Sequence, residues 1–159
     1  MLGSIKLKRS WEWSAMGKHP AVMDYFQLGA GEPLVSAFAA WIENGYQKLA
    51  SKNRTGPAFC SWRFWAKGMR KGYIAGGVVR DSSDSAGRPY PLMIMGTGAL
   101  AGCEKNWDLL PLAFAESWMQ IEYITSGYFA DLKQLAADIG RVKIPSREWP
   151  AFAQRRSKD

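Results

Sequence analysis

The stretch Asp84-Ser85-Ala86-Gly87-Arg88-Pro89-Tyr90-Pro91-Leu92 places an acid, a glycine turn and an arginine directly before an apolar strand. Pro89 and Pro91 restrict the residues that precede them, so the backbone of Arg88 and Tyr90 is biased toward extended conformations. This bias would hold the Arg88 side chain away from the first buried residues of the strand. We therefore expect a charged loop anchored to the edge of the core, and it is the first candidate for a recognition site.

The residues on either side of this loop predict a sheet. Residues 58–66 are rich in aromatic side chains and partly apolar on both faces, which favours a central strand. A short basic connection leads to residues 72–79, a second strand that would pair with the first as an antiparallel hairpin. Residues 90–95 form a third strand. Residues 11–16 alternate large apolar with smaller or polar side chains, as a half-buried strand does.

Three segments have helical periodicity. The first spans residues 33 to about 50 and begins with a proline suited to a first helical turn. Its expected core stripe is Leu34, Phe38, Trp41, Ile42, Gly45 and Leu49. The second helix is expected from Pro111 to near Gly127, with the stripe Leu112, Ala115, Trp118, Met119, Glu122 and Tyr123. The third is expected over residues 128–139, with Gly140 as its C-terminal stop.

This order of elements predicts the fold class α/β, as a single-domain layered sandwich with a mixed or antiparallel central sheet flanked by helices. A length of 159 residues with 47% apolar content suits one domain with a sizeable core. We place that domain at residues 1–140. Residues 141–159 contain prolines and six basic side chains, and we expect them to form a loose, partly disordered tail.

Charge is concentrated at the two ends of the chain. The net charge is +7, but the first 18 residues hold four bases against one acid, and residues 141–159 hold six bases against two acids. The residues between them are therefore neutral overall. A nucleic-acid-binding domain normally carries a basic patch on its folded body, so this distribution argues against nucleic acid as the partner.

The eight tryptophans leave one nucleic-acid alternative open, a stacking platform for single strands. The competing interpretation places Trp41, Trp62 and Trp118 on core stripes, which their spacing favours. Together with the neutral body, this interpretation makes single-strand binding the minor alternative.

The cysteines and the hydropathy of the chain indicate the cellular compartment. Cys60 and Cys103 are too few for a disulfide framework and lack metal-ligand spacing, so we expect reduced core thiols in a cytoplasmic protein. The longest uncharged run is too short to span a bilayer, and the basic start lacks the apolar segment of a secretion signal. We therefore expect no stable membrane insertion.

Patterns that would indicate catalysis are weak. Residues 96–102 follow an apolar strand but have the spacing Gly-x-Gly-x-x-x-Gly, so we interpret them as a plain glycine loop and not a dinucleotide site. His19 is the only histidine, which excludes zinc sites with several histidine ligands, and no nucleophile elbow accompanies it. We expect no metal, no cofactor and no enzymatic activity.

The remaining candidates are binding residues: Lys18, Asp24, Arg63, Asp84 and Arg88. An arginine held at a strand edge beside carboxylates either braces the domain as an internal ion pair or presents a recognition fork to a ligand. The residues alone favour the brace.

Four motifs, in this order, resemble a known family. They are Gly17-Lys18-His19-Pro20, Asp24-Tyr25-Phe26, Trp62-Arg63-Phe64 and the stretch from Asp84 to Leu92. The combination resembles the TagF/ImpM family, which is associated with bacterial type VI secretion systems, and it covers residues 13–127. The last motif is the most specific. Met23 departs from the family pattern, in which glycine is usual before the aspartate.

The resemblance implies an α/β sandwich with a mixed sheet, in the cytoplasm of a Gram-negative bacterium. It implies a non-catalytic, post-translational regulator of secretion-system assembly, typically a repressor, that acts with a forkhead-associated (FHA) domain scaffold protein and opposes threonine-phosphorylation control. It gives Asp24, Asp84 and Arg88 motif positions, and a binding role for them is a hypothesis. The alternative is a small nucleotide- or phospho-ligand-binding module, or an enzyme, that uses the Asp84 and Arg88 loop.

Overall fold

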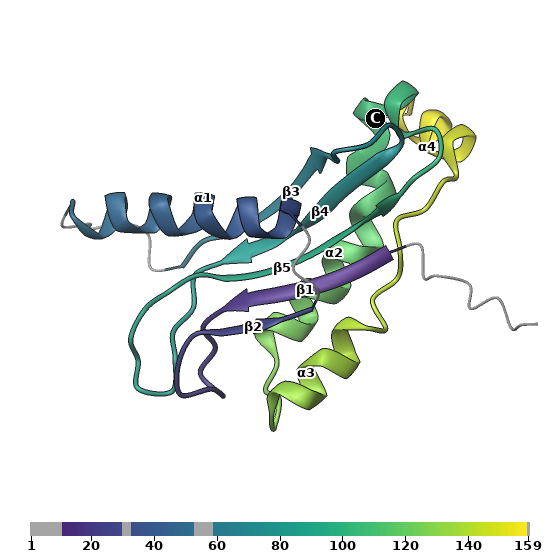
Figure 1. Ribbon diagram of the computed structural model, residues 1–159. Coiled ribbons are helices and arrows are strands. Elements are labelled where there is room, and N and C mark those ends of the chain that lie inside the picture. The colour runs from purple at the N-terminus through teal and green to yellow at the C-terminus, as the bar shows by residue number, and fades with distance from the viewer. Residues whose placement is uncertain (1–10, 30–32, 53–58, 159) are drawn as a thin grey trace, which may run out of the picture.

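Five antiparallel strands form the central sheet, in the spatial order β2-β1-β5-β4-β3 (Figure 1). The computed structural model describes residues 11–29, 33–52 and 59–158, and all elements below lie within them. The strands are β1 (Trp11–Gly17), β2 (Phe26–Leu28), β3 (Ser61–Lys67), β4 (Tyr73–Arg80) and β5 (Leu92–Ala99). The helices are α1 (Pro33–Ala50), α2 (Leu110–Ser126), α3 (Leu132–Ile139) and α4 (Trp149–Arg156), with 3-10 turns η1 (Cys103–Lys105) and η2 (Trp107–Leu109).

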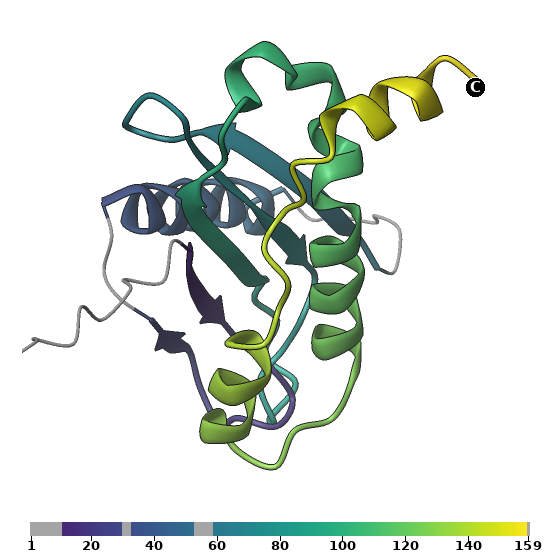
Figure 2. The same cartoon turned by 90° about the vertical axis from the view of Figure 1, so that its right-hand side faces the viewer.

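Helices cover both faces of the sheet, with α1 on one face and α2 and α3 on the other (Figure 2). Because side chains alternate along a strand, neighbouring residues of β5 serve different layers. Met93 packs with Val35 and Ile42 of α1, whereas Ile94 belongs to the core shared with α2. The predicted α/β layered sandwich is confirmed. Every pairing among the described strands is antiparallel, in contrast to the mixed sheet that the family resemblance implied.

β3 is an edge strand and not the central strand that its aromatic content predicted, although its antiparallel hairpin with β4 is confirmed. Its two faces are apolar because other elements cover each of them. Phe64 packs on Phe38 of α1 with ring centroids 5.0 Å apart, and Trp65 stacks on Trp107 at 5.2 Å. Trp62 lies outside this cover and is 54% exposed, so its assignment to the core was wrong.

The ends of α1 and α2 agree with the prediction, but their buried faces differ from it. Trp41 is 69% exposed and Tyr123 is 81% exposed, although both were expected on core stripes. The buried stripe of α2 is turned by one residue, about 100°, and consists of Leu110, Ala113, Phe114, Ser117, Trp118, Ile121 and Thr125. Apolar residues border this stripe on both sides, so periodicity located the helix but not its inner face.

α3 begins later than predicted and ends where expected, before Gly140. The delay has a local cause, since Asp131 caps the helix by accepting a hydrogen bond from the Gln134 amide at 2.8 Å. Residues 141–158 differ from the loose tail that was expected. Val142 is part of the buried core, and Trp149 donates from Nε1 to the Ala101 carbonyl at 2.9 Å.

Between Val142 and Trp149 the chain runs back along α2 (Figure 2). The Ser117 hydroxyl of α2 donates to the Lys143 carbonyl at 2.6 Å, and the Ser146 amide donates to the Ala113 carbonyl at 3.1 Å. Prolines and basic residues suggested a loose tail, but side-chain and backbone hydrogen bonds to a neighbouring helix hold this segment in place.

Smaller differences concern short segments. Residues 96–99 lie within β5 and not in a glycine loop, and Gly96 is needed there because the Trp13 ring lies 2.6 Å from where a Cβ would be. β2 was not among the strands predicted from the sequence. Cys103 is buried as predicted, whereas Cys60 is half-buried, and both are free thiols. Residue 58, the first of the strand predicted over 58–66, lies outside the described residues.

Candidate functional site

Three strand ends meet at one end of the sheet. The register pairs Gly17 of β1 and Arg80 of β4 with the same residue, Leu92 at the start of β5. The first loop (residues 18–25, after β1) and the second loop (residues 81–91, between β4 and β5) therefore leave the sheet side by side (Figure 1). The motifs singled out from the sequence are thereby brought together, although more than 60 residues separate Lys18 from Asp84 in the chain.

Two glycines shape this junction. Gly17 has a φ of +124°, and a Cβ there would lie 2.0 Å from the Pro91 carbonyl oxygen, so only glycine fits where the loops meet. Gly87, with a φ of +78°, turns the second loop back on itself. The turn lets the Asp84 amide donate to the Arg88 carbonyl at 3.1 Å. This geometry explains why the motif holds an acid, a glycine and an arginine at this spacing.

Asp84 is the centre of the cluster, and its side chain is fully buried. Its Oδ2 accepts hydrogen bonds from Lys18 Nζ at 3.0 Å and from Arg88 Nε at 2.8 Å. Its Oδ1 accepts from the backbone amides of Ala86 and Arg88, each at 3.0 Å. Burial alone would raise the pKa of this carboxyl, but the hydrogen bonds from Lys18, Arg88 and Ala86 outweigh that effect and hold the pKa at about 2. Asp84 is therefore an ionised brace at neutral pH.

Arg88 joins the buried brace to the surface. Besides Asp84 it contacts the first loop, where its Nη2 donates to the Met23 carbonyl at 2.9 Å and lies 3.7 Å from Asp24 Oδ2. The Arg88 side chain is 58% exposed and that of Asp24 is 70% exposed, whereas that of Lys18 is only 14% exposed. The cluster thus has an inner part, Lys18 with Asp84, and an outer part, Arg88 with Asp24.

A group of tyrosines beside the second loop was not anticipated from the sequence. The Tyr90 hydroxyl donates to a carboxylate oxygen of Glu43 on α1, and the Tyr46 hydroxyl donates to the Pro89 carbonyl at 2.8 Å. The Tyr90 ring lies 5.0 Å from that of Tyr46. Burial and the Glu43 carboxylate raise the pKa of Tyr90, so its hydroxyl keeps its proton and donates. The available signal was the spacing of Glu43 and Tyr46 on one turn of a helix.

Arg63 is not part of this cluster. It projects from β3 toward α2, where Nε and Nη2 donate to the two carboxylate oxygens of Glu122 at 2.7 and 2.8 Å. Its guanidinium also lies 5.7 Å from the centre of the Trp118 ring. The Trp-Arg-Phe motif therefore fastens the edge strand to the helical layer, and the prediction that placed Arg63 with the other candidates was not matched by the structure.

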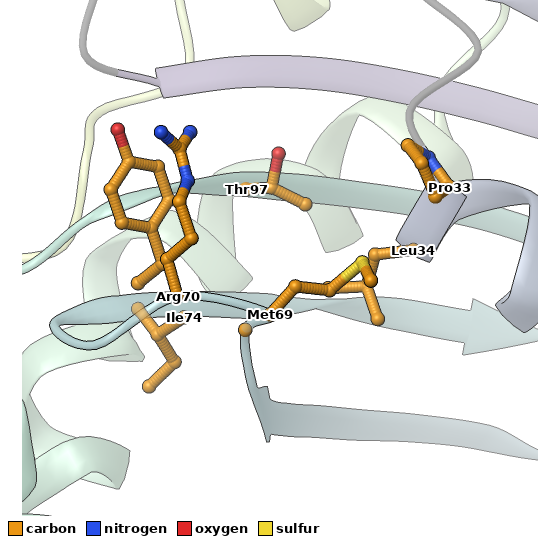
Figure 3. Close-up of a pocket in the computed structure, with 8 residues that line it drawn as sticks. Pro33, Leu34, Met69, Arg70, Ile74 and Thr97 are labelled. Atoms are coloured by element: carbon orange, nitrogen blue, oxygen red, sulfur yellow. The ribbon is translucent and has the colours of Figure 1, made fainter.

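A hollow of about 180 Å³ lies elsewhere, between the β3–β4 hairpin and the start of α1 (Figure 3). It is bordered by apolar groups such as Leu34, Met69 and Ile74, with Arg70 at its side. None of the candidate site residues lines it. Among the described residues, no three acidic, histidine or cysteine side chains are grouped so that they could hold a metal ion. No helix in the described part of the chain has the length and apolar character needed to cross a membrane.

The sequence model of the family described as TagF N-terminal domain, type VI secretion system-associated, matches residues 14–140. Comparison with curated protein sequences gives no significant match. Among solved structures, the fold is similar to the crystal structure of PA0076 from Pseudomonas aeruginosa PAO1, with a TM-score of 0.58 and 22% identity. That alignment covers 84% of this chain and 64% of the PA0076 chain, so it concerns the fold, and this chain spans less than two thirds of its relative's length. With most of its residues matched by the family model, this chain belongs to the type VI secretion system-associated TagF N-terminal domain family.

Proposed function

We propose that this protein is a cytoplasmic, post-translational repressor of type VI secretion assembly that acts by binding an FHA-domain scaffold protein. Membership of the TagF family supports the link to the secretion system. The observation that carries the proposal is the outer part of the charge cluster, where Arg88 and Asp24 stand exposed on a loop that the buried Asp84 holds in place.

The same geometry supports binding over catalysis. Asp84 accepts four hydrogen bonds, and its low pKa leaves it a poor base near neutral pH. A fully buried carboxylate that already accepts four hydrogen bonds is poorly placed to bind a substrate or a nucleotide. This weakens the alternative in which the loop of Asp84 and Arg88 forms an enzyme or nucleotide site.

The outer part also has the composition of an interaction surface. Next to Arg88 and Asp24 lie Met23, which is 81% exposed, and Tyr25, which is 45% exposed. Arginine, tyrosine and methionine are enriched in protein interfaces. Because the brace fixes the loop before any partner arrives, binding would not have to order it, and this lowers the entropic cost of association.

The experiment is a binding titration of the FHA-domain scaffold from the same gene cluster against wild type, Arg88→Ala and Asp24→Asn. Asp24→Asn is the cleaner variant because the Asp24 carboxylate is outside the buried brace. Arg141 and Asp138 provide a control pair, an exposed arginine and a partly exposed aspartate 3.5 Å apart on another part of the surface. We expect each loop variant to weaken binding by about tenfold or more, and Arg141→Ala and Asp138→Asn to leave it unchanged.

Two outcomes would contradict the proposal in different ways. Unchanged affinity of folded Arg88→Ala and Asp24→Asn proteins would remove this loop from the interface. Failure of the wild type to bind the scaffold would remove the proposed partner. Repression is checked separately, since deletion of the gene should raise secretion of a type VI effector and excess protein should lower it.

A further inference from the structure

A second hollow, lined by polar as well as apolar groups, lies at the same end of the sheet as the charge cluster. It has a volume of about 500 Å³ and is bordered by the start of the first loop, the start of the second loop and the C-terminal end of α2. None of Lys18, Asp24, Asp84 and Arg88 lines it. Arg80, the last residue of β4, is the basic side chain among the described residues that line it.

Within the part of the chain that the structure describes, Arg80 forms no salt bridge. Its Nη1 donates to the Thr125 hydroxyl at 3.0 Å, and its guanidinium stacks over the Phe59 ring, 4.6 Å from the ring centre. The acid of the neighbouring helix turn, Glu122, is already paired with Arg63. Burial lowers the pKa of Arg80, and the Glu122 carboxylate offsets only part of this cost of withdrawing a cation from water.

Two serine hydroxyls beside Arg80 add hydrogen-bond donors to the hollow. Ser82 and Ser83 follow Arg80 directly and line the hollow, and neither hydroxyl is hydrogen-bonded to another described residue. His19 is stacked on Phe129 at 4.1 Å, and burial lowers its pKa, so it adds no charge at neutral pH.

One carboxylate beside the hollow, that of Asp81, would repel an anion. Asp81 also lines the hollow, but its Oδ2 accepts a hydrogen bond from the Cys60 amide at 2.8 Å. Among the described residues that border the hollow, the charged side chains are therefore Arg80 and Asp81, and the hydrogen bond from Cys60 directs one Asp81 oxygen to the backbone without removing the charge of the carboxylate.

We propose that this hollow is a binding site for an oxyanion, a phosphate or carboxylate group, with Arg80 as its electrostatic anchor and the Ser82 and Ser83 hydroxyls as additional donors. An oxyanion matches this set because guanidinium and hydroxyl groups both donate to it, and charge-assisted bonds of this kind are among the strongest in proteins. Thr125 and Phe59 hold the guanidinium in place before the ligand arrives. The site is separate from the proposed function, since that function depends on Arg88 and Asp24 and neither residue lines the hollow.

The test is a nuclear magnetic resonance titration that follows arginine Nε–H signals of the full chain. Inorganic phosphate and acetate are added in separate arms at constant ionic strength, so that the two sources of an oxyanion are told apart. We expect a saturable shift of the Arg80 signal in at least one arm. Arg70 is the matched control, since it also stacks on an aromatic ring, Tyr73 at 4.1 Å, but lies outside this hollow. Its signal should not move.

Two variants make the result decisive. Arg80→Gln should abolish the saturable response, and its melting curve shows whether the loss of the Thr125 contact has unfolded the protein. The double variant Ser82→Ala with Ser83→Ala removes hydroxyls that hold nothing else, so it should fold normally and bind about tenfold more weakly. Equal, non-saturating shifts of Arg80 and Arg70, or full affinity in the folded double variant, would overturn the proposal.

Discussion

Replacing Gly17 by alanine tests how closely the first and second loops depend on each other. The substitution has two costs. The φ of +124° lies in a region that L side chains rarely adopt, which costs about 1–3 kcal/mol. The new Cβ would also lie 2.0 Å from the Pro91 carbonyl oxygen, a backbone atom that cannot rotate away, and overpacking of this kind costs about 1–3 kcal/mol more.

Gly72→Ala is the matched control. Gly72 also has a positive φ, +73°, but a Cβ there would have nothing within 4 Å, so only the conformational cost of about 1–2 kcal/mol remains. Urea unfolding followed by tryptophan fluorescence measures both variants. With slopes of about 1–3 kcal/mol per molar urea, Gly17→Ala should lower the midpoint clearly more than Gly72→Ala. Equal losses would refute the inference that the end of β1 is locked against the second loop.

Three further predictions concern other parts of the fold. The pKa of Asp84 is lowered in the folded state from 3.8 to about 2, so its contribution to stability is present above pH 4 and is lost as the pH falls toward 2; Asp84→Asn should flatten this acid limb in a series of melting curves. Gly76→Ala would place a Cβ 2.3 Å from the buried Phe114 ring. In urea unfolding it should lower the free energy of unfolding by about 1–3 kcal/mol, and a decrease of less than about 0.5 kcal/mol would contradict this prediction. Tyr90→Phe removes the hydrogen bond to Glu43 and should lower the free energy of unfolding by about 1 kcal/mol. Unchanged stability in urea unfolding would contradict this prediction.

Local patterns predicted the elements well because their causes are local. The proline at the start of α1 and the glycine after α3 act within one helical turn, and both boundaries were found where expected. The β3–β4 hairpin likewise depends on a short connection. The sequence did not show which apolar side chains other elements would bury. Trp41 and Trp62 have the spacing of core residues, yet both are exposed.

The candidate site was predictable in part. The structure brings Lys18, Asp24, Asp84 and Arg88 together, because the sheet register places the two loops side by side; their binding role stays a prediction. Arg63 was grouped with them, but it projects from β3 to Glu122 of α2 and makes no hydrogen bond to the other four residues. The sequence could not divide the cluster into inner and outer parts, since that division depends on the burial of one carboxylate.

The strand order β2-β1-β5-β4-β3 has a consequence for how the chain folds. β3 and β4 can pair as soon as they are synthesised. Trp11 of β1 pairs with Gly98, so β1 can complete its pairing only when nearly all of β5 is present. Pairings this distant in sequence close slowly, because the entropy of the long loop must be lost first. The contact of Lys18 with Asp84 belongs to this same late step, and the surface that carries Arg88 and Asp24 therefore exists only on chains whose sheet is complete.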